Sequence, residues 1–279
     1  VGAEAGALMT TGVQHVLIGA NAGDALTEGN SNIAMGKGAL TADTLGSNAV
    51  AIGKEALATQ NFTSATNNYN VAIGYEAGKA VTTGTSNTFV GGLAGDAAQT
   101  NSFSTLVGAS TDCSDTSSNN CNGFGYAISA VTGYTTIGIG TSDIRAEHGV
   151  ATWATVSDQR YKKDIVDSTA GLSFINALQP RTFKYKTLGE LPDTFRAYEE
   201  GSSEVYKSDQ TQHGFIAQEV KTAIDATSGV SNGFKMWAER PDGSQEVAEA
   251  ALIPVLTKAI QELSAQVEAL TARIETLEG

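Results

Sequence analysis

A glycine that recurs at a nearly fixed interval dominates the first 110 residues of the chain. Each occurrence follows a short apolar stretch, as in NVAIGYEAG at Asn70 and AVAIGKEAL at Ala49. The successive intervals are 17, 17, 17, 21, 17 and 17 residues, between Gly2, Gly19, Gly36, Gly53, Gly74, Gly91 and Gly108. The longer interval contains a four-residue insertion within NFTSATNN. A period of this length is typical of solenoids, in which each unit stacks on the next because it cannot bury its apolar face alone.

Within one unit the residues alternate as they do in a short strand. Val71 and Ile73 fall on one face of such a strand, and Asn70 and Ala72 fall on the other. The recurrent glycine suits a tight corner with a positive φ or a close backbone approach. The abundance of Ala and Gly fits a narrow coil better than a thick sandwich. We therefore expect a mainly β stalk over residues 1–110.

The same repeats resemble those in the heads of trimeric bacterial adhesins and in phage tail-fibre shafts, where NxVAIG-like units recur. The segments at Asn70 and Ala49 carry this resemblance, which covers about residues 1–110. It implies a trimeric β-roll or β-prism stalk and says little about a ligand. A monomeric β-solenoid remains the alternative.

Residues 111–156 lose the period and gather aromatic side chains at the end of the stalk: Phe124, Tyr126, Tyr134 and Trp153. Exposed aromatic residues among Ser, Thr and Asn suit sugar binding, which would make the segment a receptor-contacting tip. The alternative is a capping core that closes the last open coil. We favour the cap, because solenoids need one.

Two cysteines, Cys113 and Cys121, enclose the sequence SDTSSNN in this segment. Their separation allows a small disulfide-closed loop, and two free thiols are the equal alternative. No His or further Cys stands at ligand spacing, so we expect no metal site.

The charge of the chain limits its partners. A net charge of −13 argues against nucleic-acid binding, which usually leaves a basic patch, and no apolar run reaches the about 18 residues of a membrane-spanning helix. The composition changes at Ser157: 23 of the 31 glycines precede it, and the chain after it is densely charged. We expect a domain boundary there.

The boundary carries the motif SDQRYKKDI, which starts at Ser157 and includes Lys162. A serine hydroxyl becomes a nucleophile when a base removes its proton. Lysine acts as that base only if burial or nearby positive charge lowers its pKa, and Arg160 and Lys163 would supply such charge. The spacing does not fix a geometry, and on its own it favours two solvated surface residues.

Three further motifs follow in order: GLSFINALQPRTFKYK at Gly171, HGFIAQEV at His213 and ALIPVLTKAIQEL at Ala251. With SDQRYKKDI they closely resemble the C-terminal intramolecular chaperone of phage tailspikes and tail fibres, of the endosialidase type, over residues 157–279. The resemblance implies an α+β domain that trimerises, holds three stalk chains in register while they fold, and then cuts its own chain.

The resemblance also implies the site residues. It places the nucleophile on Ser157, the general base on Lys162 and the scissile bond between Val156 and Ser157. Asp158 and Arg160 match positions that shape the turn. His213 matches the third motif, where a packing or hydrogen-bonding role is favoured over a catalytic one. No cofactor is implied.

The last 27 residues or so show a heptad pattern, about 252–279, with Ile or Val at a and Leu at d: Ile253, Leu256, Ile260, Leu263, Val267, Leu270, Ile274 and Leu277. This predicts a long coiled-coil helix. β-Branched a positions with Leu at d favour two strands in isolation. We nevertheless expect a trimer, because the stalk repeats and the resemblance both require it. Before it, FIAQEVKTAI predicts a helix and FKMWAERPDGSQEV a strand pair.

Together these features predict the C-terminal region of a homotrimeric phage tail fibre, made in the host cytoplasm and carried on the virion tail. We expect its partner to be a host cell-surface receptor, and a glycan is the kind of receptor expected. The expected activity is a single self-cleavage. One alternative is a trimeric bacterial adhesin head, which would need a C-terminal membrane anchor. Others are a receptor-binding fibre that keeps its chaperone uncleaved, and a polysaccharide-degrading tailspike, for which no carboxylate pair stands out in residues 1–156.

Overall fold

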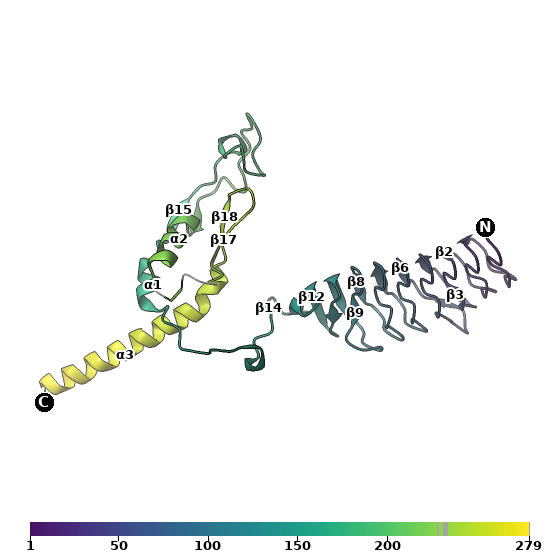
Figure 1. Ribbon diagram of the computed structural model, residues 1–279, viewed down its shortest axis with the longest axis horizontal. Coiled ribbons are helices and arrows are strands. Elements are labelled where there is room, and N and C mark those ends of the chain that lie inside the picture. The colour runs from purple at the N-terminus through teal and green to yellow at the C-terminus, as the bar shows by residue number, and fades with distance from the viewer. Residues whose placement is uncertain (228, 231–233, 279) are drawn as a thin grey trace. The chain divides into compact units, whose positions relative to one another are not determined.

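The computed structural model describes residues 1–227, 229–230 and 234–278, and it divides into two compact units, Val1–Tyr161 and Lys162–Gly279. The first unit is a stack of coils that follow one another in chain order (Figure 1). The second unit combines short strands with helices and ends in one long helix. Gly279, the last residue of the predicted coiled coil, lies outside the described residues.

The predicted β-solenoid is confirmed. Each coil contributes one short strand to a continuous parallel sheet, formed by β1 (Val16–Ile18), β2 (Ile33–Met35), β4 (Val50–Ile52), β6 (Val71–Ile73), β7 (Thr88–Val90), β8 (Thr105–Val107), β10 (Asn122–Tyr126) and β12 (Tyr134–Ile139). The register follows the repeat, and Val50 pairs with Val71 across the 21-residue interval. The insertion is therefore absorbed outside the sheet. Two smaller parallel pairs lie beside it, β3 (Gly46–Ser47) with β5 (Thr66–Asn67) and β9 (Asp112–Cys113) with β11 (Ser129–Ala130).

The core of the solenoid lies on the alanine side of the strands. The middle residue of each three-residue strand points inward, and five of these are fully buried: Ala34, Ala51, Ala72, Phe89 and Leu106. Small side chains predominate because the coil is narrow, as the composition predicted. The residues on either side of each middle residue point outward. These strands therefore bury their middle residue and leave their flanking Val and Ile side chains on the outer face.

Buried asparagine side chains link neighbouring coils by hydrogen bonds. Asn70 Oδ1 accepts a hydrogen bond from the backbone N–H of Asn87 at 3.0 Å, and Asn87 Oδ1 accepts one from Ser104 N–H at 3.0 Å. Asn32 makes the same contact with Ala49 at 2.8 Å. The three amide nitrogens donate to backbone carbonyls, so the buried polar groups are satisfied. The same bond thus recurs at three junctions between neighbouring coils, and Ala49 interrupts the series because it has no side-chain acceptor.

The recurrent glycines are required by the close approach of neighbouring coils. Gly91 has φ +138°, and a Cβ there would lie 2.7 Å from the carbonyl carbon and oxygen of Gly108. The adjacent Gly92 has nothing within 4 Å of the same position. We predict that Gly91→Ala lowers the free energy of unfolding by about 3 kcal/mol or more, because both backbone strain and a clash result, whereas Gly92→Ala changes it by about 0.5 kcal/mol or less. Urea unfolding followed by circular dichroism checks this, and equal midpoints for the two variants would contradict it.

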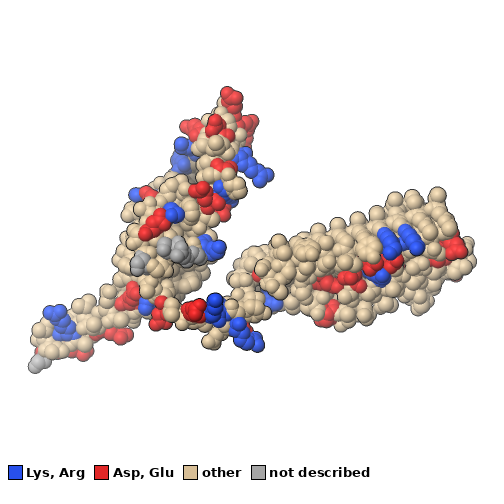
Figure 2. Space-filling view, viewed as in Figure 1, with Lys and Arg blue, Asp and Glu red and all other residues tan. Residues whose placement is uncertain are grey.

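The outward residues of the sheet form an apolar strip along the solenoid, here called the outer stripe. Its exposed members are Val16, Ile18, Met35, Ile73, Phe124, Ile137 and Ile139, and its half-buried members are Ile33, Val50, Ile52, Val71, Val90 and Val107. Ile139 is 66% exposed and Val16 is 44% exposed. Charged side chains of the solenoid gather elsewhere: on the face that Figure 2 shows they form one band across a largely uncharged surface. In such a charged cluster, Lys79 Nζ bridges Glu55 at 2.7 Å and Glu76 at 3.1 Å.

The parallel stack ends where the chain reverses direction. β13 (Ser142–Glu147) pairs antiparallel with β12, and β14 (Trp153–Ala154) pairs antiparallel with β13. The aromatic residues of this segment do not form a buried capping core, since Tyr126 and Trp153 are 57% and 54% exposed. Tyr134 is half-buried beneath the Arg145 guanidinium, 5.1 Å from the ring centroid. The strand reversal, not an aromatic cluster, therefore ends the stack.

Cys113 and Cys121 are free thiols, and both are buried in the last coils. They surround Ser104 Oγ, which lies 3.8 Å from Cys113 Sγ and accepts a hydrogen bond from Cys121 N–H at 3.3 Å. The two thiols also hydrogen-bond each other, and the bond from Cys113 lowers the pKa of Cys121. Both thiols are closed off from solvent, so an external disulfide reaches them only when the last coils open.

We predict that glutathione disulfide converts these thiols to an intramolecular disulfide. The Cys121 thiolate displaces one glutathione, and Cys113 displaces the second from the mixed disulfide. Closing so short a loop is expected to stabilise the solenoid by about 2 kcal/mol. Mass spectrometry of the unreduced 113–121 peptide should show the loss of two hydrogens, and Cys113→Ser is the control that stays uncrosslinked. Two thiols still titratable after treatment and unfolding would contradict the prediction.

The second unit is built around α1 (Leu172–Ala177), α2 (Ala217–Ala226) and the start of α3 (Leu252–Glu278). Its core contains Phe174, Val220, Ile224, Met236 and Val255. β15 (Arg181–Phe183) pairs with β16 (Gln212–Gly214), and the predicted strand pair is confirmed as β17 (Trp237–Glu239) with β18 (Gln245–Val247). Single turns of 3-10 helix lie at η1 (Gln159–Tyr161), η2 (Leu188–Glu190) and η3 (Glu249–Ala251).

The predicted long helix is confirmed as α3, and most of it lacks a packing partner in the single chain. Leu252, Val255 and Ala259 are buried in the unit's core, and Glu262 Oε2 accepts a hydrogen bond from Leu172 N–H at 2.8 Å. Beyond this point the heptad residues are exposed, with Val267 at 60% and Ile274 at 53%. Within the described part of the chain, no helix combines the length and apolar character needed to cross a bilayer.

Candidate functional site

The predicted cleavage segment follows the last strand of the solenoid as an exposed stretch of chain. Val156 is 56% exposed, Tyr161 is 79% exposed, and Ser157 and Lys162 are also exposed. The boundary between the two compact units falls between Tyr161 and Lys162, inside the SDQRYKKDI motif. The peptide bond before Ser157 is therefore accessible and lies close to the point where the chain passes from one unit to the next.

A tight turn organises the residues that follow Ser157. Asp158 accepts hydrogen bonds from Arg160 N–H at 2.8 Å and from the Arg160 guanidinium, whose Nη2 lies 2.7 Å from Oδ2. Tyr161 N–H donates to the Asp158 carbonyl at 3.1 Å and completes η1. The Arg160 guanidinium lowers the pKa of Asp158 and keeps it ionised. The structure thus places Asp158 and Arg160 in one tight turn, and the supporting role in cleavage that the resemblance implied for them stays a prediction.

Lys162, the predicted general base, lies on an exposed stretch of the chain, since residues 159–169 are exposed throughout. A lysine becomes a general base near neutral pH when burial or positive charge lowers its pKa. Arg160, the expected source of positive charge beside Lys162, is engaged with Asp158. The predicted catalytic pair stays a prediction.

His213 lies away from this segment in the sequence and sits on β16, opposite Thr182 of β15. Its side chain is exposed beside a shallow hollow lined by Pro180, Arg181, Gly214 and Phe215. Arg181 forms a bidentate ion pair with Glu219 of α2, with a shortest distance of 2.7 Å. The ion pair gives Glu219 of the HGFIAQEV motif a structural role, and the role of His213 itself stays a prediction.

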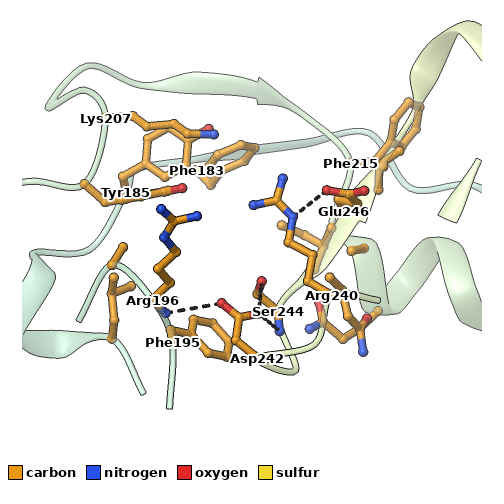
Figure 3. Close-up of a pocket in the computed structure, with 18 residues that line it drawn as sticks. Phe183, Tyr185, Phe195, Arg196, Lys207, Phe215, Arg240, Asp242, Ser244 and Glu246 are labelled. Atoms are coloured by element: carbon orange, nitrogen blue, oxygen red, sulfur yellow. Dashed lines mark hydrogen bonds and ion pairs between the residues drawn. The ribbon is translucent and has the colours of Figure 1, made fainter. Parts of the chain in front are cut away.

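The second unit also contains a larger cleft, which the sequence did not reveal. It has a volume of about 710 Å³ and lies between β15, the loop 191–207 and the β17–β18 hairpin. Figure 3 shows aromatic and basic side chains converging on it, among them Phe183, Tyr185, Arg196 and Arg240. The alternation of RTFKYK was the one sequence signal for it, because Phe183 and Tyr185 share a face of an extended chain.

Residues 157–228 match the model of the peptidase family described as the chaperone of endosialidase. The match begins at Ser157, the residue that the sequence singled out as the start of the chaperone. The match supports the C-terminal chaperone domain of endosialidase-type proteins in the second unit, and the matched family is one of self-cleaving peptidase domains. Searches of curated proteins and of solved structures found no match.

The described residues hold no cluster of three or more His, Cys, Asp or Glu side chains that would suit a metal ion. Residues 156–165 supply a serine hydroxyl, lysine amines and a turn held by an Asp–Arg pair. Such a set suits one acyl transfer from a peptide bond once a base is activated.

Proposed function

We propose that the chain is part of a homotrimeric phage tail fibre whose C-terminal chaperone directs trimerisation and folding and then releases itself by cutting next to Ser157. The observation that carries the proposal is the outer stripe. It runs the length of the solenoid, and soluble monomers rarely expose so long a contiguous apolar surface. The exposed heptad seam of α3 gives the chaperone an apolar surface of the same kind.

A need for register explains why such a stalk would require a chaperone. The short strands repeat with the same parallel pairing from coil to coil, and each presents similar outward residues. Three chains that associate through the outer stripe can therefore slip by one coil at little local cost. Three chaperones joined through α3 would fix the register at one end of the stalk before the coils stack.

Self-cleavage then follows assembly. Lys162 is exposed in the single chain, so association of chaperones is what would bury it and lower its pKa. Cleavage between Val156 and Ser157 by the Ser157 hydroxyl would separate the stalk from its template. Without the chaperone, the stalk cannot unfold and dissociate along the route by which it assembled, so the trimer becomes kinetically stable. The fibre would be made in the host cytoplasm, join the virion tail and contact a host cell-surface glycan.

Light scattering coupled to size exclusion tests the assembly on the uncut Ser157→Ala chain. A trimer has a mass of about 86 kDa, three times the 28.7 kDa of one chain. A mass of one chain at micromolar concentration would overturn the proposal. The outer stripe is tested separately with Ile73→Asp, which should favour smaller species, and with the exposed Glu4→Gln as a matched surface control.

A further inference from the structure

The cleft of the second unit joins three parts of the chain. Phe183 and Tyr185 come from β15 and the residues after it, Arg196 from the loop 191–207, and Arg240 from the hairpin β17–β18. The Arg196 backbone N–H donates to Asp242 Oδ2 at 3.2 Å, which ties the loop to the hairpin. The cleft is therefore a hollow between the loop and the hairpin, and this hydrogen bond joins the two segments beside it (Figure 3).

The two carboxylates of the lining are already occupied. Asp242 accepts hydrogen bonds from Ser244 N–H at 3.0 Å and from Ser244 Oγ at 2.6 Å, and these bonds lower its pKa to about 2. Glu246 accepts a hydrogen bond from Arg240 Nε at 2.6 Å. Neither carboxylate approaches the Arg196 guanidinium closely enough for an ion pair.

The cations of the lining outnumber these carboxylates. The Arg196 side chain makes no ion pair or hydrogen bond with any described residue, and its guanidinium points into the cleft toward Tyr185 (Figure 3). Lys207 Nζ lies over the rings of Tyr185 and Tyr206, at 5.5 and 5.1 Å, and has no carboxylate partner among the described residues. Arg240 engages Glu246 through Nε, which leaves its terminal nitrogens to donate elsewhere. A chain with a net charge of −13 thus presents a local surplus of positive charge.

Aromatic rings supply the apolar part of the cleft. Phe183 and Tyr185 meet edge to face at 5.5 Å, and Tyr185 and Tyr206 do so at 5.8 Å. Phe195 and Phe215 complete the walls. Ligand sites commonly have this form, an apolar hollow with a few convergent polar groups.

We propose that this cleft binds a small organic anion in which a phosphate or carboxylate is attached to a flat apolar ring. Guanidinium groups recognise both oxyanions through paired N–H donors, and the ring would lie against the aromatic walls. Contacts to both Arg196 and Arg240 would hold the loop 191–207 against the hairpin. Binding would therefore order this loop, and this role is independent of Ser157 and of self-cleavage.

Isothermal titration of the full Ser157→Ala chain tests the proposal with four probes: phenyl phosphate, phenylacetate, inorganic phosphate and benzyl alcohol. We expect phenyl phosphate or phenylacetate to bind with a Kd on the order of 1 mM or tighter, and at least about tenfold more tightly than inorganic phosphate or benzyl alcohol. Whichever of these two probes has the lower Kd shows whether the cleft prefers a phosphate or a carboxylate. No binding of either, or equal binding of a probe that lacks the ring or the charge, would overturn the proposal.

Variants locate the site. Arg196→Gln should weaken binding of the aryl anion at least about tenfold, and Arg196→Lys, which keeps the charge and loses the fork, should weaken it less. Lys186→Gln removes the same charge from an exposed residue outside the lining and should leave the Kd within about twofold, since only screened long-range charge changes. Equal Kd values for Arg196→Gln and Lys186→Gln, in chains with unchanged circular dichroism, would place the ligand elsewhere and overturn the proposal.

Discussion

A chain carrying Ser157→Ala is expected to remain whole after expression, whereas the unaltered chain yields two fragments on a denaturing gel. Cleavage before Ser157 divides 279 residues and 28.7 kDa into fragments of about 16 and about 13 kDa. Loss of a nucleophilic hydroxyl leaves nothing to attack the peptide carbonyl, so the rate should fall by about 10³-fold or more. Ser157 is exposed, so the substitution should leave the fold unchanged.

Two neighbouring lysines provide a matched test of the base. Lys162→Arg keeps the positive charge but removes an amine that can become neutral near pH 7, so this chain should also stay whole. Lys163→Arg makes the same replacement one residue later and should cut at the normal rate. N-terminal sequencing of the smaller fragment should begin at Ser157. An unaltered chain that stays whole as a trimer would favour a fibre that keeps its chaperone.

The repeat predicted the strands and their register closely, because one glycine marks the same corner in every coil. The predicted strand at Asn70–Ile73 is observed as Val71–Ile73. The sequence did not show which face of that strand is buried, because alternation separates two faces without naming the inner one. The structure places Ala72 inside and leaves Ile73 38% exposed, in a core where small side chains predominate beside a few large ones such as Phe89.

The site was less predictable than the stalk. The resemblance placed Asp158 and Arg160 in a turn, and the structure shows a contact between these neighbours two residues apart. Catalytic activation of Lys162 would depend on groups brought together by folding and association, which no local spacing encodes. The cleft was missed for a similar reason. Its basic residues Arg196 and Arg240 are 44 positions apart and follow no motif.

Charges placed in the α3 seam are expected to abolish both assembly and cleavage. Val267 and Ile274 occupy a positions, are exposed in the single chain and lie beyond the part of α3 that packs on the chaperone core. In a trimer each would be buried, so the double variant Val267→Asp/Ile274→Asp would bury six carboxylates without partners. Burial of an unpaired charge costs several kcal/mol for each group. This exceeds the about 1.5–3 kcal/mol that each buried apolar side chain contributes. The variant should therefore elute with the mass of one chain, 28.7 kDa.

The same helix supplies a control with the same added charge. Ala265 and Ala272 occupy f positions, which face away from the seam of a coiled coil, so Ala265→Asp/Ala272→Asp should still form trimers and still cut. If association is what activates Lys162, the seam variant remains whole on a denaturing gel even though Ser157 and Lys162 are intact. A seam variant that is monomeric and yet cuts at the normal rate would show that the single chain activates its own lysine. A seam variant that remains trimeric would instead show that the outer stripe of the solenoid suffices to hold three chains together.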